Sequence, residues 1–446
     1  MKKSKIVFKA GRVSPLFLLF LLLAAPLLCG WGRDGHELVS RRAIAQLPAP
    51  LAARLADEKM LNAIIAHSSD PDHDVAALSE KLRTADAALK ASPGDPKLSA
   101  AVEAARAAWQ ATRSKHFFDL DALTDLPPPF DRFPHDRPAA ELAAAEYLVA
   151  HDRSEAAALL RLHGESELPA QLDTATLRKL GAALLEKHGT LPWTINEQVA
   201  AVSAAMKQDD PARLAVAIAV LSHYVGDLHQ PFHTTRNFDG QLTGNHGIHL
   251  VIDDNLIRRN RDYYTDWPTA YDRPCQNVPD VLTAVFAQVG RNAALTTRLV
   301  AADTEARRQS GATANDFDWG RQRYRRSFSW LDNLLERKDF AGLDPHEVRL
   351  LKETDDLQVL VVADDDLVRR QLAAASSMTA SLIYTAWLRA DRPGLDATAD
   401  SAAAATTPPT APQQPEHKNN PLIGVFMAAG AVFLFIVLRR RHLRSK

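Results

Sequence analysis

Apolar side chains along most of this chain recur with helical spacing. Between residues 31 and 395 they fall every three or four positions, and the sequence lacks a convincing two-residue alternation of the kind that predicts a half-buried strand. Long Ala- and Leu-rich stretches predict helices at residues 139–162, 174–187, 194–206, 211–228, 281–301 and 368–390. We therefore expect an all-α fold, and we find no internal repeat.

A further stretch, residues 75–115, predicts two Ala-rich helices on either side of the turn Ser92-Pro-Gly-Asp-Pro96. Proline and glycine together end the first helix and let the chain reverse its direction. We expect this helical hairpin to be an insertion in a single helical domain that covers residues 31–395.

The charge of the chain is distributed unevenly. Of 446 residues, 46% are hydrophobic and 24% are charged, which is ordinary for a globular protein. The 53 basic and 54 acidic side chains nearly cancel, but residues 1–30 and 421–446 each hold five basic side chains and no acid. The chain between them therefore has 43 basic and 54 acidic side chains, a formal charge of −11. This balance excludes a basic coat for binding nucleic acid.

The basic N-terminus has the pattern of an export signal. In residues 1–30, basic side chains precede a Leu-rich run of about a dozen residues, which is typical of a secretory signal peptide. We expect cleavage after Gly30, with lipidation of Cys29 as the alternative.

The C-terminus has the pattern of a membrane anchor. Residues 421–438 carry no charge, which is just long enough for a transmembrane helix, and three arginines follow at once. Such a cluster stays on the cytoplasmic side, so residues 439–446 would be a cytoplasmic tail and the helical domain would lie outside the cytoplasmic membrane. The Ala/Thr/Pro-rich residues 396–420 predict a flexible linker between the two.

The strongest chemical signal lies in the predicted helix at 211–228. Val216, Val220, His223 and Asp227 share one stripe of this helix, and the last two are one turn apart. An imidazole and a carboxylate that face an interior with valines need a compensating charge, which a cation supplies.

Further imidazoles and carboxylates follow in the next two dozen residues. His233 lies just after the proline that ends the helix, and His249 and Asp253 repeat the four-residue spacing. Neutral imidazole nitrogen and carboxylate oxygen are the usual zinc donors other than thiolate. His246 competes with His249, but it has no acid four residues later.

Weaker signals lie nearer the N-terminus. Cleavage after Gly30 would free the amino group of Trp31, which can chelate a metal together with its own carbonyl, and His36 could complete that site. Asp70 and His116 are two more donors, although a helix cap and a half-buried imidazole are their ordinary interpretations.

Taken together, these motifs resemble one superfamily, which contains the bacterial zinc-dependent phospholipases C and the three-zinc, single-strand-specific nucleases of the S-one/P-one type. The resemblance covers about residues 31–390 apart from part of the hairpin. It rests on His223-Tyr-Val-Gly-Asp227-Leu-His-Gln-Pro-Phe-His233, His116-Phe-Phe-Asp119, Gly247-Ile-His249-Leu-Val-Ile-Asp253, Gly189-Thr-Leu-Pro-Trp193 and Tyr384-Thr-Ala-Trp-Leu388.

The resemblance implies three zinc ions in a helical cleft. It implies a first zinc held by Asp70, His116, His223 and Asp227, a second held by His233, His249 and Asp253, and a third held by His36 and the amino and carbonyl groups of Trp31. Asp227 would bridge the first and third ions. Asp70 would orient or deprotonate the attacking water.

The chain departs from the family pattern at the Asp70 segment. The nucleases usually carry an arginine three residues beyond this position, where this chain has His73. The interval from Asp70 to His116 is also longer than typical, which leaves Asp72 as a rival for Asp70.

The function implied is that of an exported, membrane-anchored zinc hydrolase of phosphodiester bonds. Its substrate would be single-stranded nucleic acid, as for an endonuclease, or phospholipid, as for phospholipase C, and the motifs do not decide between them. A non-catalytic, zinc-containing binding or scaffold ectodomain is the alternative, and a helical ectodomain without metal is a third interpretation. The sequence identifies no protein partner.

Overall fold

The computed structural model describes residues 31–162, 168–169, 171–317 and 328–392, which contain helices and connecting segments but no strand. The chain divides into two units, Met1–Gly394 and Leu395–Lys446, and every described residue belongs to the first. The predicted all-α class is therefore confirmed for the described part of the chain.

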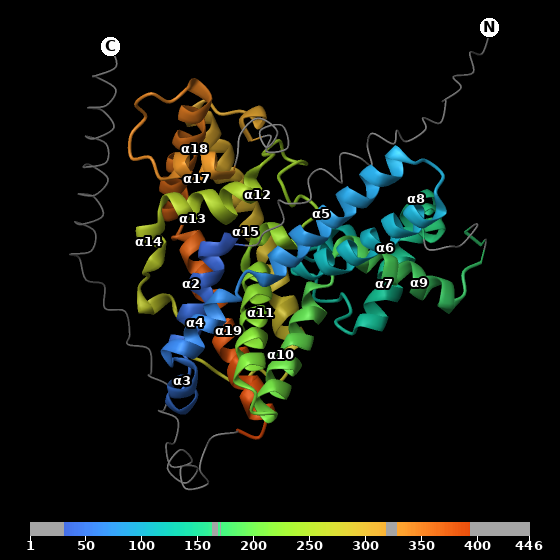
Figure 1. Cartoon of the computed structure of the whole chain (residues 1–446), viewed down its shortest axis with the longest axis horizontal. Coiled ribbons are helices and arrows are strands. Elements are labelled where there is room, and N and C mark those ends of the chain that lie inside the picture. The colour runs from blue at the N-terminus through green and yellow to red at the C-terminus, as the bar shows by residue number, and fades with distance from the viewer. Residues whose placement is uncertain (1–30, 163–167, 170, 318–327, 393–446) are drawn as a thin grey trace, which may run out of the picture. The chain divides into compact units, whose positions relative to one another are not determined.

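Long helices form the centre of the first unit (Figure 1). They are α2 (Gly32–Ala45), α4 (Glu58–Ala66), α10 (Leu191–Lys207), α11 (Pro211–His229), α15 (Val281–Ser310), α18 (Pro345–Ala363) and α19 (Leu367–Arg389). Helix α11 packs against α2, α4, α10 and α19, while α15 packs against α18. As a result, α11 is enclosed by neighbours along the half that carries the predicted donors.

Local sequence explains where these helices begin and end. The side chains of Asp210 and Asp280 cap α11 and α15 by accepting the backbone N–H three residues later, at 3.1 and 2.9 Å. Helix α15 continues beyond the predicted residue 301 and stops at Gly311, whose φ of 72° is left-handed. Helix α18 was not predicted, although Asp344 and Glu347 form a capping box at its start.

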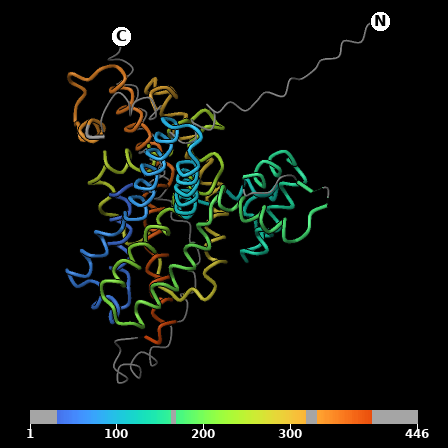
Figure 2. Tube along the Cα trace, turned by 45° about the vertical axis from the view of Figure 1, so that its right-hand side comes forward, coloured from blue at the N-terminus to red at the C-terminus, as the bar shows by residue number. Residues whose placement is uncertain are grey.

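The predicted hairpin is present as α5 (Asp70–Ala91) and α6 (Pro96–Arg113), which lie side by side in both views (Figures 1 and 2). The two helices bury a small apolar core of their own, formed by Val75, Leu82, Val102, Ala105 and Trp109. Helix α5 begins earlier than residue 75, so its first turn contains both candidate carboxylates, Asp70 and Asp72.

Three further helices, α7 (Arg137–His151), α8 (Arg153–Leu162) and α9 (Thr174–His188), pack mainly on one another and gather in one group in Figure 2. The prediction of a single helix over 139–162 is wrong. Asp152 leaves helical geometry with a φ of −146°, and its carboxylate accepts the N–H of Glu155 at 2.9 Å, which starts a second helix.

Short elements carry much of the chemistry. They are α3 (Ala49–Leu55), η1 (Ser114–His116), η2 (Leu120–Ala122), η3 (Pro231–Thr234), α12 (Ile248–Leu250), the π-helical turn η4 (Val251–Asn255), α13 (Leu256–Arg259), α14 (Arg261–Thr265), η5 (Thr269–Tyr271), η6 (Ala314–Phe317) and α17 (Phe328–Leu335). Turns η1, η3 and η4 hold His116, His233 and Asp253, respectively. Single π-helical turns are rare and often mark functional sites.

The predicted end segments are not tested by this structure. The signal peptide (1–30), linker (396–420), transmembrane helix (421–438) and tail (439–446) lie outside the described residues. Among the helices that are described, none has the length and apolar character that a membrane crossing needs.

Candidate metal centre

The last two turns of α11 bury an imidazole and a carboxylate. His223 and Asp227 are both completely inaccessible to solvent, and His223 Nε2 lies 3.4 Å from Asp227 Oδ2. The stripe on which they were predicted faces inward only in this half of the helix, because Val216 is 38% exposed.

A glycine lets the first helix approach α11 closely. A Cβ atom at Gly226 would lie 2.9 Å from His36 Nδ1, so this position has no room for a side chain. The Ser40 and Ser222 hydroxyl groups, 2.8 Å apart, join the same two helices. As a result, the ring of His36 stacks on that of His223 with a centroid distance of 3.9 Å.

Three donors form the first group, His116, His223 and Asp227, whose ligand atoms lie within 4.8 Å of one another. His116 Nδ1 is 3.0 Å from Asp227 Oδ2 and 3.1 Å from His223 Nε2. Turn η1, which follows the hairpin, therefore delivers His116 to the end of α11.

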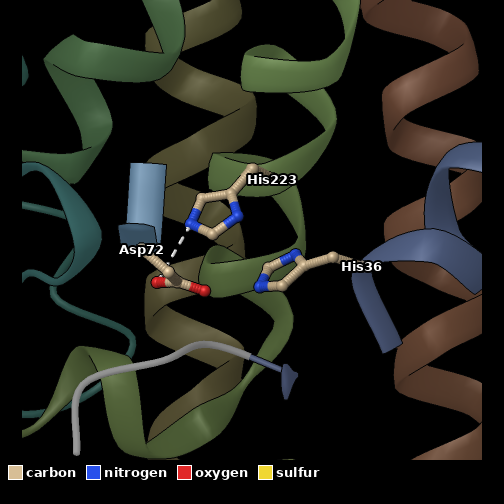
Figure 3. A group of neighbouring side chains, drawn as sticks. All are labelled: His36, Asp72 and His223. Atoms are coloured by element: carbon tan, nitrogen blue, oxygen red, sulfur yellow. Dashed lines mark ion pairs between the residues drawn. The ribbon is translucent and has the colours of Figure 1, made fainter. Parts of the chain in front are cut away.

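A second group consists of His36, Asp72 and His223, whose side chains point toward one another from α2, α5 and α11 (Figure 3). Asp72 Oδ1 lies 3.6 Å from both His223 Nε2 and His116 Nδ1. His36 Nε2 lies 3.5 Å from Asp227 Oδ1. The first and second groups share His223, and these contacts make them one continuous cluster.

The structure brings Asp72 into this cluster and leaves Asp70 out of it. The Asp70 carboxylate is 2.6 Å from His67 Nδ1, and both side chains are 42% exposed. Two residues along the first turn of a helix point in clearly different directions, so only one of the two carboxylates can face α11. The structure therefore groups Asp72, the rival that the sequence left open, with the other candidate donors, and the role of Asp70 as a zinc ligand that acts on the water stays a prediction.

The third group consists of His233, His249 and Asp253. Asp253 Oδ2 lies 2.8 Å from His249 Nε2 and 3.8 Å from His233 Nε2. His246, the competitor of His249, is 53% exposed and pairs with Asp239 instead.

Trp31 lies beside the first two groups. It is completely buried, and its ring is close to Gly226, between His223 and Asp227. Its carbonyl accepts the N–H of Gly35 at 3.1 Å in the first turn of α2. Residue 30 is outside the described residues, so the free amino group at Trp31 stays a prediction.

Backbone carbonyl groups orient three of the imidazoles. The Nδ1–H groups of His223, His233 and His249 donate to the carbonyl oxygens of Ser68, His116 and Phe238, at 2.9, 2.6 and 2.9 Å. Each such bond fixes the tautomer and leaves the Nε2 lone pair directed at the other donors. Metal-binding histidines in proteins are generally held in this way.

Several buried atoms in the clusters make no hydrogen bond among the described residues. They include His36 Nε2, Asp72 Oδ1, His116 Nε2, Asp227 Oδ1 and His233 Nε2, while His249 Nε2 and Asp253 Oδ2 form the ion pair given above. An unsatisfied buried polar atom costs about 1–3 kcal/mol, and a metal ion coordinated by these atoms would remove this cost. Nitrogen and carboxylate oxygen suit zinc, and these residues fit a metal ion.

The electrostatics of the clusters also favour a bound cation. Burial lowers the pKa of His36 well below its usual value and that of His116 to about 4, which keeps both imidazoles neutral. Burial acts in the same direction on His223, but the carboxylates of Asp227 and Asp72 outweigh it and raise its pKa to about 9. The buried carboxylates thus attract a positive charge, which a metal could supply in place of a proton.

Sequence reasoning missed Gln230 as a supporting residue. Its side chain is completely buried, its Nε2 donates to Asp253 Oδ1, and its Oε1 accepts the N–H of Phe232 at 2.6 Å. A signal was present in the sequence, because a Gln directly before the helix-ending proline and between two histidines is unusual in an apolar segment.

No family model, curated protein or solved structure matches this chain.

Proposed function

We propose that this protein is a zinc-dependent phosphodiester hydrolase. The observation that supports this proposal best is the convergence of eight buried imidazole and carboxylate side chains into three groups whose ligand atoms lie within 4.8 Å of one another. The backbone hydrogen bonds behind His223, His233 and His249 also support it, because metal-binding histidines are generally held in this way.

The eight side chains would hold the metal in three overlapping sets. His116, His223 and Asp227 form one set, His36, Asp72 and His223 form the second, and His233, His249 and Asp253 form the third. Zinc bound in such sets lowers the pKa of a bound water toward neutrality and stabilises charge on phosphoryl oxygens.

The residues of this chain have separate tasks in the proposed reaction. Asp72 takes the part that the sequence suggested for Asp70, and its Oδ1 is the atom we expect to orient the attacking water and accept its proton. Asp227 links the imidazoles of His36 and His116 through its two oxygens. The carbonyl groups behind the histidines keep the donor atoms fixed during the reaction.

The resemblance implies two candidate substrates, single-stranded nucleic acid and phospholipid, and we propose both. Single-stranded nucleic acid and phospholipid both present a phosphodiester with an alkoxide leaving oxygen, whose developing charge a metal ion could stabilise. We further propose that the protein is exported and anchored at the outer side of the cytoplasmic membrane, as the sequence of its two ends suggests.

The first test measures metal and activity on the same purified protein. The ectodomain that begins at Trp31 should contain close to three zinc ions per chain by elemental analysis. It should hydrolyse bis(p-nitrophenyl) phosphate, lose this activity to a chelator and regain it when zinc is added back. Parallel assays on single-stranded DNA, RNA and phosphatidylcholine would identify the substrate.

Each outcome has a clear meaning. Fewer than two zinc ions per chain would overturn the proposal as a whole. Full zinc content without hydrolysis of any of these phosphodiesters would favour the alternative, a zinc-containing binding or scaffold domain.

A further inference from the structure

A second buried charged cluster lies next to the metal centre, on helices α15 and α18. We call Asn245, Asp303, Arg307 and Glu353 the α15–α18 network. Asp303 and Glu353 are completely buried, and Asn245 and Arg307 are 2% and 7% exposed. None of the four was singled out by its sequence, and none belongs to the metal groups.

Oppositely charged side chains pair with each other inside the network. Arg307 Nε lies 2.7 Å from Asp303 Oδ2, and its guanidinium stacks 4.2 Å from the ring of Phe317. Burial and the neighbouring Asp303 carboxylate raise the pKa of Glu353 well above its usual value, and burial also raises the pKa of Asp303, so protonated carboxyl is favoured here. Arg307 supplies a positive charge to the same network.

The same network holds the backbone that leads to His249. Arg307 donates from Nη1 to the carbonyl of His246 at 3.1 Å and from Nη2 to that of Asn245 at 3.2 Å. Asn245 Nδ2 in turn donates to Asp303 Oδ2 at 2.6 Å. The backbone at Gly240 approaches this point closely, because a Cβ at Gly240 would lie 2.4 Å from the Asn245 carbonyl oxygen.

This backbone sets the position of the metal donor. The Asn245 carbonyl also accepts the N–H of Ile248 at 3.0 Å, which starts the helical turn that carries His249. His249 reaches back to the Phe238 carbonyl at the other end of the loop. A shift of Asn245 and His246 would therefore move His249 relative to Asp253 and His233.

We propose that Arg307 and Asp303 are positioning residues for the third metal group, His233, His249 and Asp253. They act through the main chain at residues 245–246 and contact no ligand atom themselves. This inference rests on the proposed metal centre, and it assigns the network the task of fixing one donor of one group.

The test is a zinc titration of the metal-free ectodomain with Arg307→Lys, which keeps the charge but loses the fork that reaches two carbonyls. Outer-sphere substitutions typically weaken metal binding by about 10–100-fold, and we expect one of the three zinc ions to weaken by this factor while the other two are unchanged. Arg298→Lys is the matched control, because Arg298 lies on the same helix and pairs with Asp364, away from the loop.

A double-variant cycle separates positioning from general destabilisation. In a His249→Ala background the third group is already broken, so adding Arg307→Lys should leave the remaining two affinities unchanged. Asp303→Asn should reproduce the loss, whereas Glu353→Gln, at a carboxyl whose raised pKa favours the protonated form, should not. If Arg307→Lys does not fold, Asn245→Ala removes the side-chain bond to Asp303 and keeps the buried charges and the two carbonyls that Arg307 reaches, and it should weaken the same single ion.

Two results would overturn the inference. One is an Arg307→Lys protein that binds three zinc ions as tightly as the Arg298→Lys control. The other is a uniform weakening of all three ions in the single variant. A wild-type protein that binds no zinc would overturn the proposed function instead, so the two failures are distinguishable.

Discussion

The metal centre and the α15–α18 network both bury charged side chains in the same helical unit, and they neutralise this charge in different ways. In the network, Arg307 supplies a permanent cation to Asp303, and the pKa of Glu353 is raised well above its usual value. In the metal groups, three carboxylates face five imidazoles, and the carboxylates raise the pKa values of His223 and His249 to about 9.

The difference teaches how a metal site can be distinguished from a structural ion cluster. In a structural cluster the donors face acceptors, and the chain completes its own charge balance. In a metal site the lone pairs face one another, while hydrogen bonds from behind fix the imidazoles. Residue type alone would not separate the two clusters, since both contain buried acids, and the deciding feature is the direction in which the lone pairs point.

Among the substitutions that test this contrast, Asp227→Asn should have the largest effect on zinc content and activity. Its carboxylate contacts His36, His116 and His223, at 3.5, 3.0 and 3.4 Å. We expect the variant to lose two zinc ions together and its phosphodiesterase activity to fall by at least about 100-fold, because even outer-sphere losses cost 10–100-fold. Elemental analysis and kcat/KM measure this. Loss of a single ion would contradict the bridging role, and His246→Ala is the control.

Asp72→Asn should have the next largest effect. Asp72 faces His116 and His223 from the buried side of α5, whereas the partly exposed Asp70 pairs with His67. We expect Asp72→Asn to lower zinc content by about one ion per chain. Asp70→Asn should retain all the zinc, since an exposed ion pair contributes only about 0–1 kcal/mol. The reverse ranking in zinc analysis would restore Asp70 as the ligand.

Removal of zinc should destabilise the protein by a moderate amount. A ligand at 100 times its Kd stabilises the folded state by about 2.7 kcal/mol, which for a large domain corresponds to a fall in Tm of roughly 5–10 °C on removal. Thermal unfolding with a chelator and with excess zinc measures this difference. An unchanged Tm in the presence of chelator would show that the metal centre, like the α15–α18 network, is stable without a metal ion.

The α15–α18 network should make a smaller, pH-dependent contribution to the unfolding free energy. The folded-state pKa of Glu353 is raised, so its contribution to stability is complete below the unfolded value near 4.5 and is lost as the pH rises toward the folded value. The unfolding free energy of the wild type should therefore fall relative to that of Glu353→Gln by up to about 1.4 kcal/mol per pH unit between pH 5 and 7. Urea unfolding at several pH values measures the slope, and parallel curves would show that Glu353 is ionised in the folded state.

The sequence was informative where one short segment contains the chemistry. The spacing of His223, Asp227 and His233 depends only on helix geometry and a proline, and the structure buries all three. The helix at 174–187 was also predicted closely, because its start and its apolar period are local properties. The split at Asp152 was missed, since the Ala-rich sequence on both sides favours helix equally well.

Contacts between residues that are far apart in the sequence could not be predicted from local patterns. The choice of Asp72 over Asp70 depends on the direction in which α5 leaves its first turn, and that direction is set by packing of α5 on α6 and α11. The support of His249 by Arg307 joins residues far apart in the sequence, and a single sequence gives no sign of such a pair.

By itself the sequence determined an all-α domain, the helix that carries His223 and Asp227, and the type of chemistry that imidazoles and carboxylates at these spacings provide. Only the tertiary structure decided which carboxylate of the Asp70 segment faces the cluster and which histidine pairs with Asp253. It also showed which buried acid pairs with Arg307 and which buried acids face imidazoles in groups that could hold a metal ion. The physical reason is that residue spacing fixes directions within one helix, whereas the convergence of donors from α2, α5, η1, α11, η3 and η4 is fixed by how these elements pack.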